Sequence, residues 1–122
     1  MTEEEVGLLR EAEEVRIETS RGPDAPVHRT TIWVVVDERD RVLVRSVRGE
    51  RGRWYREVLA NPECALLVAR HRIPFRAEPA GDEERIRACS EALRRKYAAD
   101  PALGSMLRPE TLPTTLQLRP VP

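Results

Sequence analysis

The sequence has 122 residues, and its 21 basic side chains are balanced by 21 acidic ones, so the net charge is zero. This length predicts one domain spanning residues 1–122, and the neutral charge argues against general affinity for nucleic acids. The longest apolar run, residues 32–36, is far too short to cross a bilayer, and the acidic N-terminus lacks a signal-peptide pattern. We therefore expect a cytoplasmic protein without a membrane segment.

The first part of the chain predicts one helix and three strands. Apolar residues recur at helical spacing within residues 2–14, which indicates an amphipathic helix. Residues 15–19 alternate between apolar and polar and predict a strand that ends at a Gly- and Pro-rich turn. Residues 28–37 are rich in β-forming side chains, and their unbroken apolar half predicts a central strand buried on both faces. Residues 41–47 follow a charged turn and predict the next strand.

The middle of the chain predicts a short helix followed by two strands. Residues 54–60 have the periodicity of a helix, and its expected buried face consists of Trp54, Tyr55, Val58 and Leu59. An Asn-Pro pair ends this helix. Residues 64–69 and 73–78 predict two strands, and Pro74 places the second at an edge or a bulge.

The last third predicts a long helix that begins after Asp82, a short helix from Pro101 to about Arg108, and a closing strand over residues 114–118. This order predicts a mainly β fold with added helices, a six-stranded antiparallel barrel with N-terminal, inserted and C-terminal helices. Its expected core contains Ile32, Val34, Val44, Leu66, Val68, Phe75 and Leu116.

The segment from Arg45 to Arg56, RSVRGERGRWYR, carries five arginines against one acid, together with two glycines. It lies between a predicted strand and a predicted helix. Glycines allow backbone N–H groups to approach a ligand closely, a helix N-terminus favours anions, and arginine forks match phosphate oxygens. We interpret this segment as a phosphate-binding turn. The alternative is a solvated basic loop.

Residue types that carry other chemistry are scarce. There are only two histidines, which argues against a histidine metal site, and no nucleophile motif is present. The two cysteines, Cys64 and Cys89, stand alone in apolar segments, and we expect two buried free thiols. The acids form no evident pair for acid–base catalysis, so an enzyme of this sequence would need a cofactor.

Four segments resemble an uncharacterised bacterial domain family: HRTTIWVVV (28–36), the arginine turn (45–56), RIPFR (72–76) and LPTTL (112–116). The resemblance extends from Val15 to Pro120. That family is placed with the split β-barrels of the pyridoxamine-phosphate-oxidase-like and deazaflavin-dependent nitroreductase type.

The resemblance implies a cofactor site and a homodimer. Arg29, Thr30, Thr31 and Ile32 would border the ring of a flavin or deazaflavin. The phosphate end would be held by Ser46, Arg48, Arg51, Gly52 and Arg53, and Trp54 would anchor the helix or cover the ring. The sequence departs from the flavin oxidases because it lacks a lysine at the phosphate positions, and from the nitroreductases because it lacks their long N-terminal substrate segment.

The residues and the resemblance together favour a protein that binds FMN or an 8-hydroxy-5-deazaflavin coenzyme. A catalytic member would be an oxidoreductase that transfers hydride to a small organic acceptor. One alternative is a non-catalytic module that binds a phosphorylated ligand or haem in the same cleft. Another is nucleic-acid contact through the arginine turn, which a single basic turn in a neutral chain disfavours.

Overall fold

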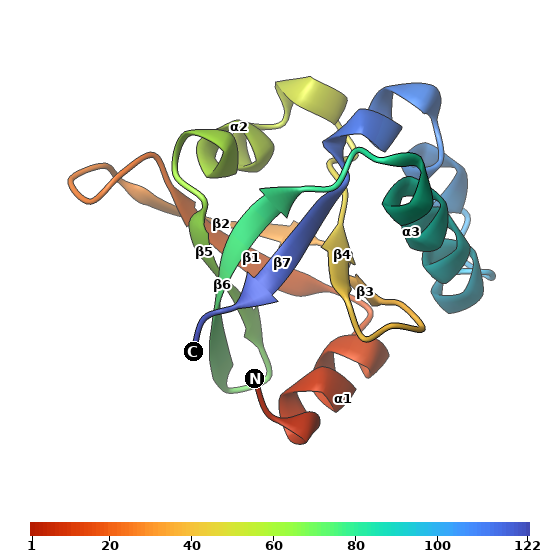
Figure 1. Ribbon diagram of the computed structural model, residues 1–122, viewed down its shortest axis with the longest axis horizontal. Helices are drawn as coiled ribbons and strands as arrows, with labels where there is room; N and C mark the ends of the chain where they lie inside the picture. Colours follow the sequence, from red (N-terminus) through yellow and green to blue (C-terminus); the bar gives the residue numbers. More distant parts are fainter.

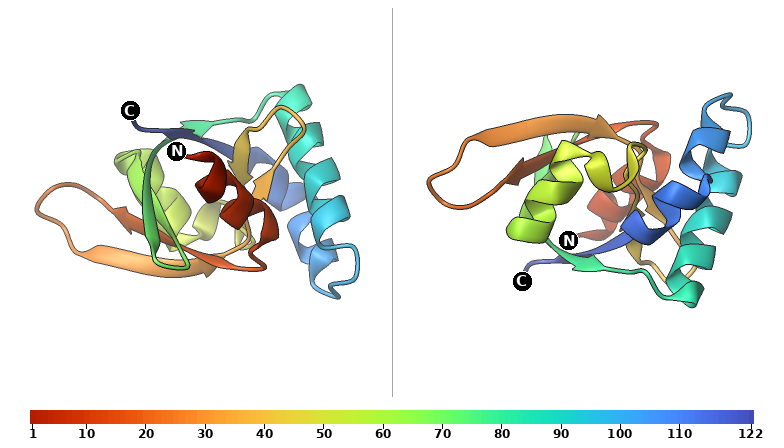
Figure 2. Two further views of the ribbon diagram at one scale, coloured as in Figure 1. Left: turned by 90° about the horizontal axis from the view of Figure 1, so that it is seen from below. Right: turned by 90° about the horizontal axis from the view of Figure 1, so that it is seen from above.

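The computed structural model describes residues 1–122, and its centre is one seven-stranded antiparallel sheet in the order β2-β1-β5-β6-β7-β4-β3 (Figure 1). The sheet curls into a split β-barrel (Figure 2), which confirms the predicted fold class. The strands are β1 (Val15–Ser20), β2 (Val27–Ile32), β3 (Val35–Val36), β4 (Val42–Val44), β5 (Glu63–Val68), β6 (His71–Pro79) and β7 (Leu116–Pro120).

There are seven strands rather than six because the long strand predicted over residues 28–37 is divided at Trp33 and Val34. Its two parts, β2 and β3, form the two edges of the sheet, so the expectation of a central strand is wrong. The Val34 carbonyl accepts a hydrogen bond from Lys96 Nζ at 2.7 Å instead of joining a ladder. Since only two residues connect the two edges, the sheet has to curl until those edges lie close together.

The apolar run 32–36 is buried on both faces for a different reason. Val34 and Val36 point into the barrel core, whereas Val35 packs in a second apolar cluster with Leu43 and residues of the long helix. Side chains that alternate along an extended segment therefore enter two separate cores. The run is therefore buried on both faces, as its apolar pattern indicated. The outer face, however, is covered by the long helix and not by neighbouring strands.

Three α-helices surround the sheet: α1 (Glu3–Glu11), α2 (Arg53–Ala60) and α3 (Glu83–Lys96). The helices α1 and α2 cover opposite ends of the barrel, and α3 lies beside β3 and β4 (Figures 1 and 2). The short helix predicted from Pro101 is instead a 3₁₀ segment, η2 (Leu103–Met106). A second 3₁₀ segment that was not predicted, η3 (Pro109–Thr114), follows it, so the closing strand begins later than expected. None of the helices combines the length and apolar character needed to span a bilayer.

The barrel core is a cluster of 19 buried residues, and it includes all seven predicted core residues. Cys64 and Cys89 are buried free thiols, as predicted. The buried face of α2 differs from the expectation: Leu59 is 53% exposed, whereas Glu57 is only 2% exposed. The polar partners of Glu57, described below, explain how a carboxylate can occupy that position.

We predict that Val34→Asp lowers the free energy of unfolding by about 3 kcal/mol or more, because an unpaired carboxylate would enter the barrel core. Leu59→Asp is the matched control, since Leu59 lies on α2, outside the barrel core, and is 53% exposed. It should cost less than about 1 kcal/mol. Urea unfolding followed by circular dichroism measures both, and equal midpoints for the two variants would contradict the assigned position of Val34.

Candidate functional site

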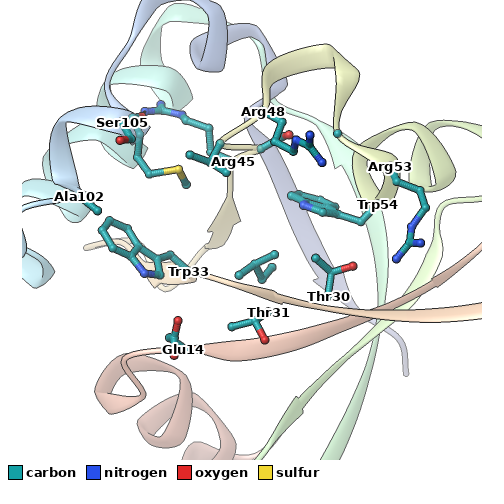
Figure 3. A pocket seen from close by; sticks show the side chains of 15 residues that line it. Glu14, Thr30, Thr31, Trp33, Arg45, Arg48, Arg53, Trp54, Ala102 and Ser105 are labelled. Carbon is teal, nitrogen blue, oxygen red and sulfur yellow. The ribbon is translucent and has the colours of Figure 1, made fainter.

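A cavity of about 620 Å³ lies between β2, the segment that follows β4, the start of α2, and η2 (Figure 3). Its volume is in the range of small-molecule sites. Eight of the ten residues predicted to hold a cofactor line it: Thr30, Thr31, Ile32, Ser46, Arg48, Gly52, Arg53 and Trp54. The fold therefore brings the strand and the arginine turn, which are separated in the sequence, to one cavity.

The structure does not bring the other two predicted residues, Arg29 and Arg51, to this cavity. Arg29 lies on the opposite face of β2 from Thr30, and its Nε donates to Glu18 at 3.1 Å. Arg51 is the last residue of the 3₁₀ turn η1 (Gly49–Arg51) and is exposed.

The cavity has seven further lining residues that were not among the predicted cofactor contacts: Glu14, Trp33, Arg45, Val47, Ala102, Ser105 and Met106. Trp33 carried a usable signal, because it directly follows the predicted Ile32. Ala102 and Ser105 come from a segment more than forty residues beyond the arginine turn and belong to no motif, so only the tertiary fold could have revealed them.

Arg45 belongs to the arginine turn, but it is an internal anchor and is only 1% exposed. Its Nε donates to Thr115 Oγ1, and its terminal nitrogens donate to Ser90 Oγ and to the carbonyls of Met106 and Ile86, all at 3.0 Å. No carboxylate pairs with it. Burial lowers the pKa of Arg45, yet the guanidinium remains charged because its ordinary pKa is so high. This side chain ties the end of β4 to α3, η2 and the residue that precedes β7.

The turn after Arg45 has a tight backbone that two glycines make possible. Gly49 has φ +65°, a left-handed conformation that favours glycine. At Gly52, a Cβ atom would lie 2.4 Å from Ser46 Oγ. That hydroxyl donates to the Gly49 carbonyl at 2.8 Å, and the Ser46 amide donates to Thr114 Oγ1 at 3.0 Å. The serine hydroxyl therefore braces the turn, whereas the resemblance implies a cofactor contact for this residue.

The side chains of Arg48 and Arg53 line the cavity without forming an ion pair. Arg53 is the first residue of α2, which has no side-chain cap, so amide groups at this helix end retain donors for a ligand. Two unpaired guanidinium groups and a helix N-terminus together create a positive potential that suits a phosphate or carboxylate.

Strand β2 contributes a polar atom without a partner. Thr30 Oγ1 is buried and is the one such side-chain atom in the protein that makes no hydrogen bond. A buried hydroxyl without a partner is costly, and a ligand acceptor or donor in the cavity would satisfy it. Thr30 and the arginine turn thus face the same space from opposite sides (Figure 3).

A buried carboxylate fixes α2 against the sheet next to this end of the cavity. Glu57 accepts from Thr19 Oγ1 at 2.7 Å, and His28 Nδ1 lies 2.8 Å from its other oxygen. Burial alone would raise the pKa of Glu57, but the hydrogen bonds from Thr19 and His28 outweigh it and hold the pKa below its ordinary value. The residue therefore stays ionised and couples α2 to β1 and β2.

The two tryptophans of the chain, Trp33 and Trp54, lie on opposite sides of the cavity (Figure 3). Trp54 is buried at the start of α2, and Trp33 stacks on Tyr97 with ring centroids 3.8 Å apart and planes 6° from parallel. The cavity therefore combines aromatic walls with a basic end, which matches a planar ligand that carries an anionic group.

A family model described as an uncharacterized protein conserved in bacteria (DUF2255) matches residues 5–118. The chain belongs to this family. No curated protein matches the sequence. The match covers the strand, the arginine turn and η2, and so it includes every residue that lines the cavity.

Several solved structures are similar to this member of the family over most of its length. An F420-H2-dependent reductase (FDR-A) is 17% identical, with 88% of this chain and 94% of that chain covered and a TM-score of 0.67. The haem storage protein HutZ from Vibrio cholerae is 12% identical, with 98% and 90% covered and a TM-score of 0.67. A Listeria innocua protein, provisionally assigned as a pyridoxamine 5′-phosphate oxidase, is 15% identical, with 98% and 90% covered and a TM-score of 0.64. This chain shares its split β-barrel fold with these structures, as the sequence resemblance predicted.

The contact between Gly52 and Ser46 gives a test of the turn geometry. We predict that Gly52→Ala lowers the free energy of unfolding by about 1–3 kcal/mol, because the new methyl group collides with Ser46 Oγ. Ser46→Ala removes the oxygen, so the cost of Gly52→Ala should be smaller in that background. A double-mutant cycle in urea measures the coupling, and strictly additive costs would show that the two residues do not touch.

Proposed function

We propose that this protein binds a flavin-type cofactor, FMN or an 8-hydroxy-5-deazaflavin coenzyme, in the cavity between β2 and α2. The observation that carries the proposal is the pair of unpaired arginines, Arg48 and Arg53, at the uncapped N-terminus of α2, in a cavity that also has aromatic walls. Both candidate cofactors join a planar ring to a phosphate group. The similar structures include an F420-H2-dependent reductase, which supports this class of ligand.

The residues of the cavity fit each part of such a cofactor. Arg48, Arg53 and the first amides of α2 would hold the phosphate. Trp54 would pack against the ring system, and Thr30 Oγ1 would gain the hydrogen-bond partner that it lacks. Ile32 and the β2 backbone would form the floor beneath the ring.

The protein's own contribution to a reaction would be binding, orientation and exclusion of water. A bound flavin or deazaflavin supplies hydride transfer to a small organic acceptor. The lining side chains include no histidine, cysteine or tyrosine, so none of the usual protein ligands of haem iron faces the cavity apart from Met106. The flavin-type cofactor is therefore a better match to this cavity than haem, which is the alternative together with other phosphorylated ligands.

The decisive measurement compares FMN with riboflavin, which has the same ring but no phosphate. A charge-assisted hydrogen bond contributes about 1.5–3 kcal/mol, so Arg53→Glu should weaken FMN binding by roughly ten- to a hundredfold or more, since it also reverses the charge. Riboflavin should bind wild type and variant about equally. Isothermal titration calorimetry gives both affinities, and a parallel titration with the deazaflavin coenzyme tests the second candidate.

Two further charge reversals serve as controls for this experiment. Arg51→Glu changes the same charge within the same turn but outside the cavity, and Arg94→Glu changes an exposed arginine on α3 that forms no ion pair. Both should retain FMN binding within a few-fold of wild type. Equal losses in Arg51→Glu and Arg53→Glu would show a general charge effect. If neither cofactor binds the wild type, the proposal fails.

We also propose that the protein is a homodimer. Strand β2 pairs only with β1, so its other edge leaves backbone N–H and C=O groups available, and Val27 on this strand is exposed. The β1–β2 hairpin extends beyond the body of the barrel (Figure 2), where a second subunit could cover it. The core of a chain this short is modest, and a partner would enlarge it.

We expect sedimentation velocity at tens of micromolar protein to show a species of about twice the 14.0 kDa chain mass. Replacing exposed Val27 by lysine should shift the population toward monomer without lowering the monomer's own stability, because charged edge residues oppose strand pairing. A wild type that sediments only as monomer would exclude the dimer.

A further inference from the structure

The two ends of the cavity carry unpaired charges of opposite sign. Arg48 and Arg53 lie on the Trp54 side, and Glu14 lies beside Trp33 on the other side (Figure 3). None of these three residues is among the 14 ion pairs of the protein. A bound molecule is therefore the obvious source of charge complementarity at both ends.

Glu14 belongs to the segment that joins α1 to β1, and its carboxylate is exposed at the cavity wall. It makes no side-chain hydrogen bond, so it does not stabilise the fold in an evident way. Its negative charge nevertheless acts on Tyr97. Burial raises the pKa of Tyr97 to about 12, and the charge of Glu14 contributes to this increase. The carboxylate lies at the same end of the cavity as Trp33 (Figure 3).

Trp33 forms a rigid aromatic surface at this end of the cavity. Its ring lies parallel to that of Tyr97, and the Tyr97 hydroxyl donates to the Glu13 carbonyl at 2.8 Å, which fixes the pair. Met106 is buried in the same apolar cluster and also lines the cavity. A flat ring can pack on such a surface, and sulfur and aromatic groups favour the same kind of ligand.

We propose that the Trp33 end is the substrate subsite and that it takes an aromatic ring without negative charge, either neutral or cationic. This inference rests on the proposed function, because a cofactor phosphate at Arg48 and Arg53 leaves the opposite end for the second molecule. Glu14 is the specificity-determining residue: it repels anionic rings and attracts cationic ones. An exposed carboxylate interacts with a charge about 4 Å away by roughly 1 kcal/mol, which is about fivefold in affinity.

Three pyridine compounds test this proposal, since they share one ring and differ in charge: nicotinamide is neutral, N1-methylnicotinamide is a cation and nicotinate is an anion. The chain has only two tryptophans, so a ¹H–¹⁵N spectrum contains two indole signals, which Trp33→Phe and Trp54→Phe assign. Such small ligands bind with Kd on the order of 1 mM, which this method measures. Glu14→Gln is a suitable variant because Glu14 holds no structural contact.

Affinities in this series are those read from the Trp33 signal, because nicotinate attracted to Arg48 and Arg53 is reported by the Trp54 signal instead. In the wild type we expect nicotinamide and N1-methylnicotinamide to shift the Trp33 signal saturably, and nicotinate to bind there about fivefold more weakly than nicotinamide. In Glu14→Gln, nicotinate should come within twofold of nicotinamide, and the cation should lose its advantage. The proposal is overturned if nicotinate binds the wild type as tightly as nicotinamide. It is also overturned if Glu14→Gln leaves the ratios unchanged, or if no compound moves the Trp33 signal.

An FMN titration of the same samples separates this inference from the cofactor proposal. FMN should shift the Trp54 signal in both wild type and Glu14→Gln, and Arg53→Glu should suppress that shift. If FMN causes no shift while the pyridine series follows the charge order, the cofactor proposal fails and the ring subsite at Trp33 stands. If FMN behaves as expected while the pyridine series does not, only the substrate subsite is wrong.

Discussion

The cavity depends on one buried cation. The Arg45 side chain enters the interior directly after β4, where four neutral oxygens from α3, η2 and Thr115, the residue before β7, surround it. A buried charge without a counter-ion is costly unless its hydrogen bonds are satisfied, so these elements have to keep their positions around the guanidinium. Arg45 directly follows the three-residue strand β4 and begins the turn that carries Arg48 and Arg53. The anchor and the ligand-facing arginines are thus neighbours in sequence with opposite roles.

Much of the fold could be predicted from the sequence, because alternation and helical spacing report local burial directly. All seven predicted core residues are in the barrel cluster. The strand 28–37 shows the limit of that reasoning. Its apolar pattern correctly indicated burial on both faces, but the pattern cannot distinguish a central strand from an edge segment that is covered by a helix. The helix α3, fifty residues later, decides between the two.

The candidate site was predictable to the extent that it lies in contiguous segments. Strand β2 and the arginine turn were recognised, yet composition could not tell which of five arginines would be buried, free or outside the cavity. Arg45, Arg48 and Arg51 differ only in their tertiary surroundings. Tertiary surroundings also decide which side chain of α2 is buried. Helical periodicity predicts Leu59 on the buried face, but Glu57 is buried instead because Thr19 and His28 provide hydrogen bonds for its carboxylate.

Buried charge also holds the two sides of the cavity in place. The barrel core consists mostly of aliphatic side chains, whose attraction depends on buried area and has little direction. Arg45 on the η2 side and Glu57 on the α2 side instead make hydrogen bonds of defined direction. Burial disfavours the charged form of both side chains. Neutral oxygens accept hydrogen bonds from Arg45, and His28 and the Thr19 hydroxyl form hydrogen bonds with Glu57. Loss of a core methyl group would therefore weaken the whole barrel, whereas loss of either charged anchor would displace one wall of the cavity.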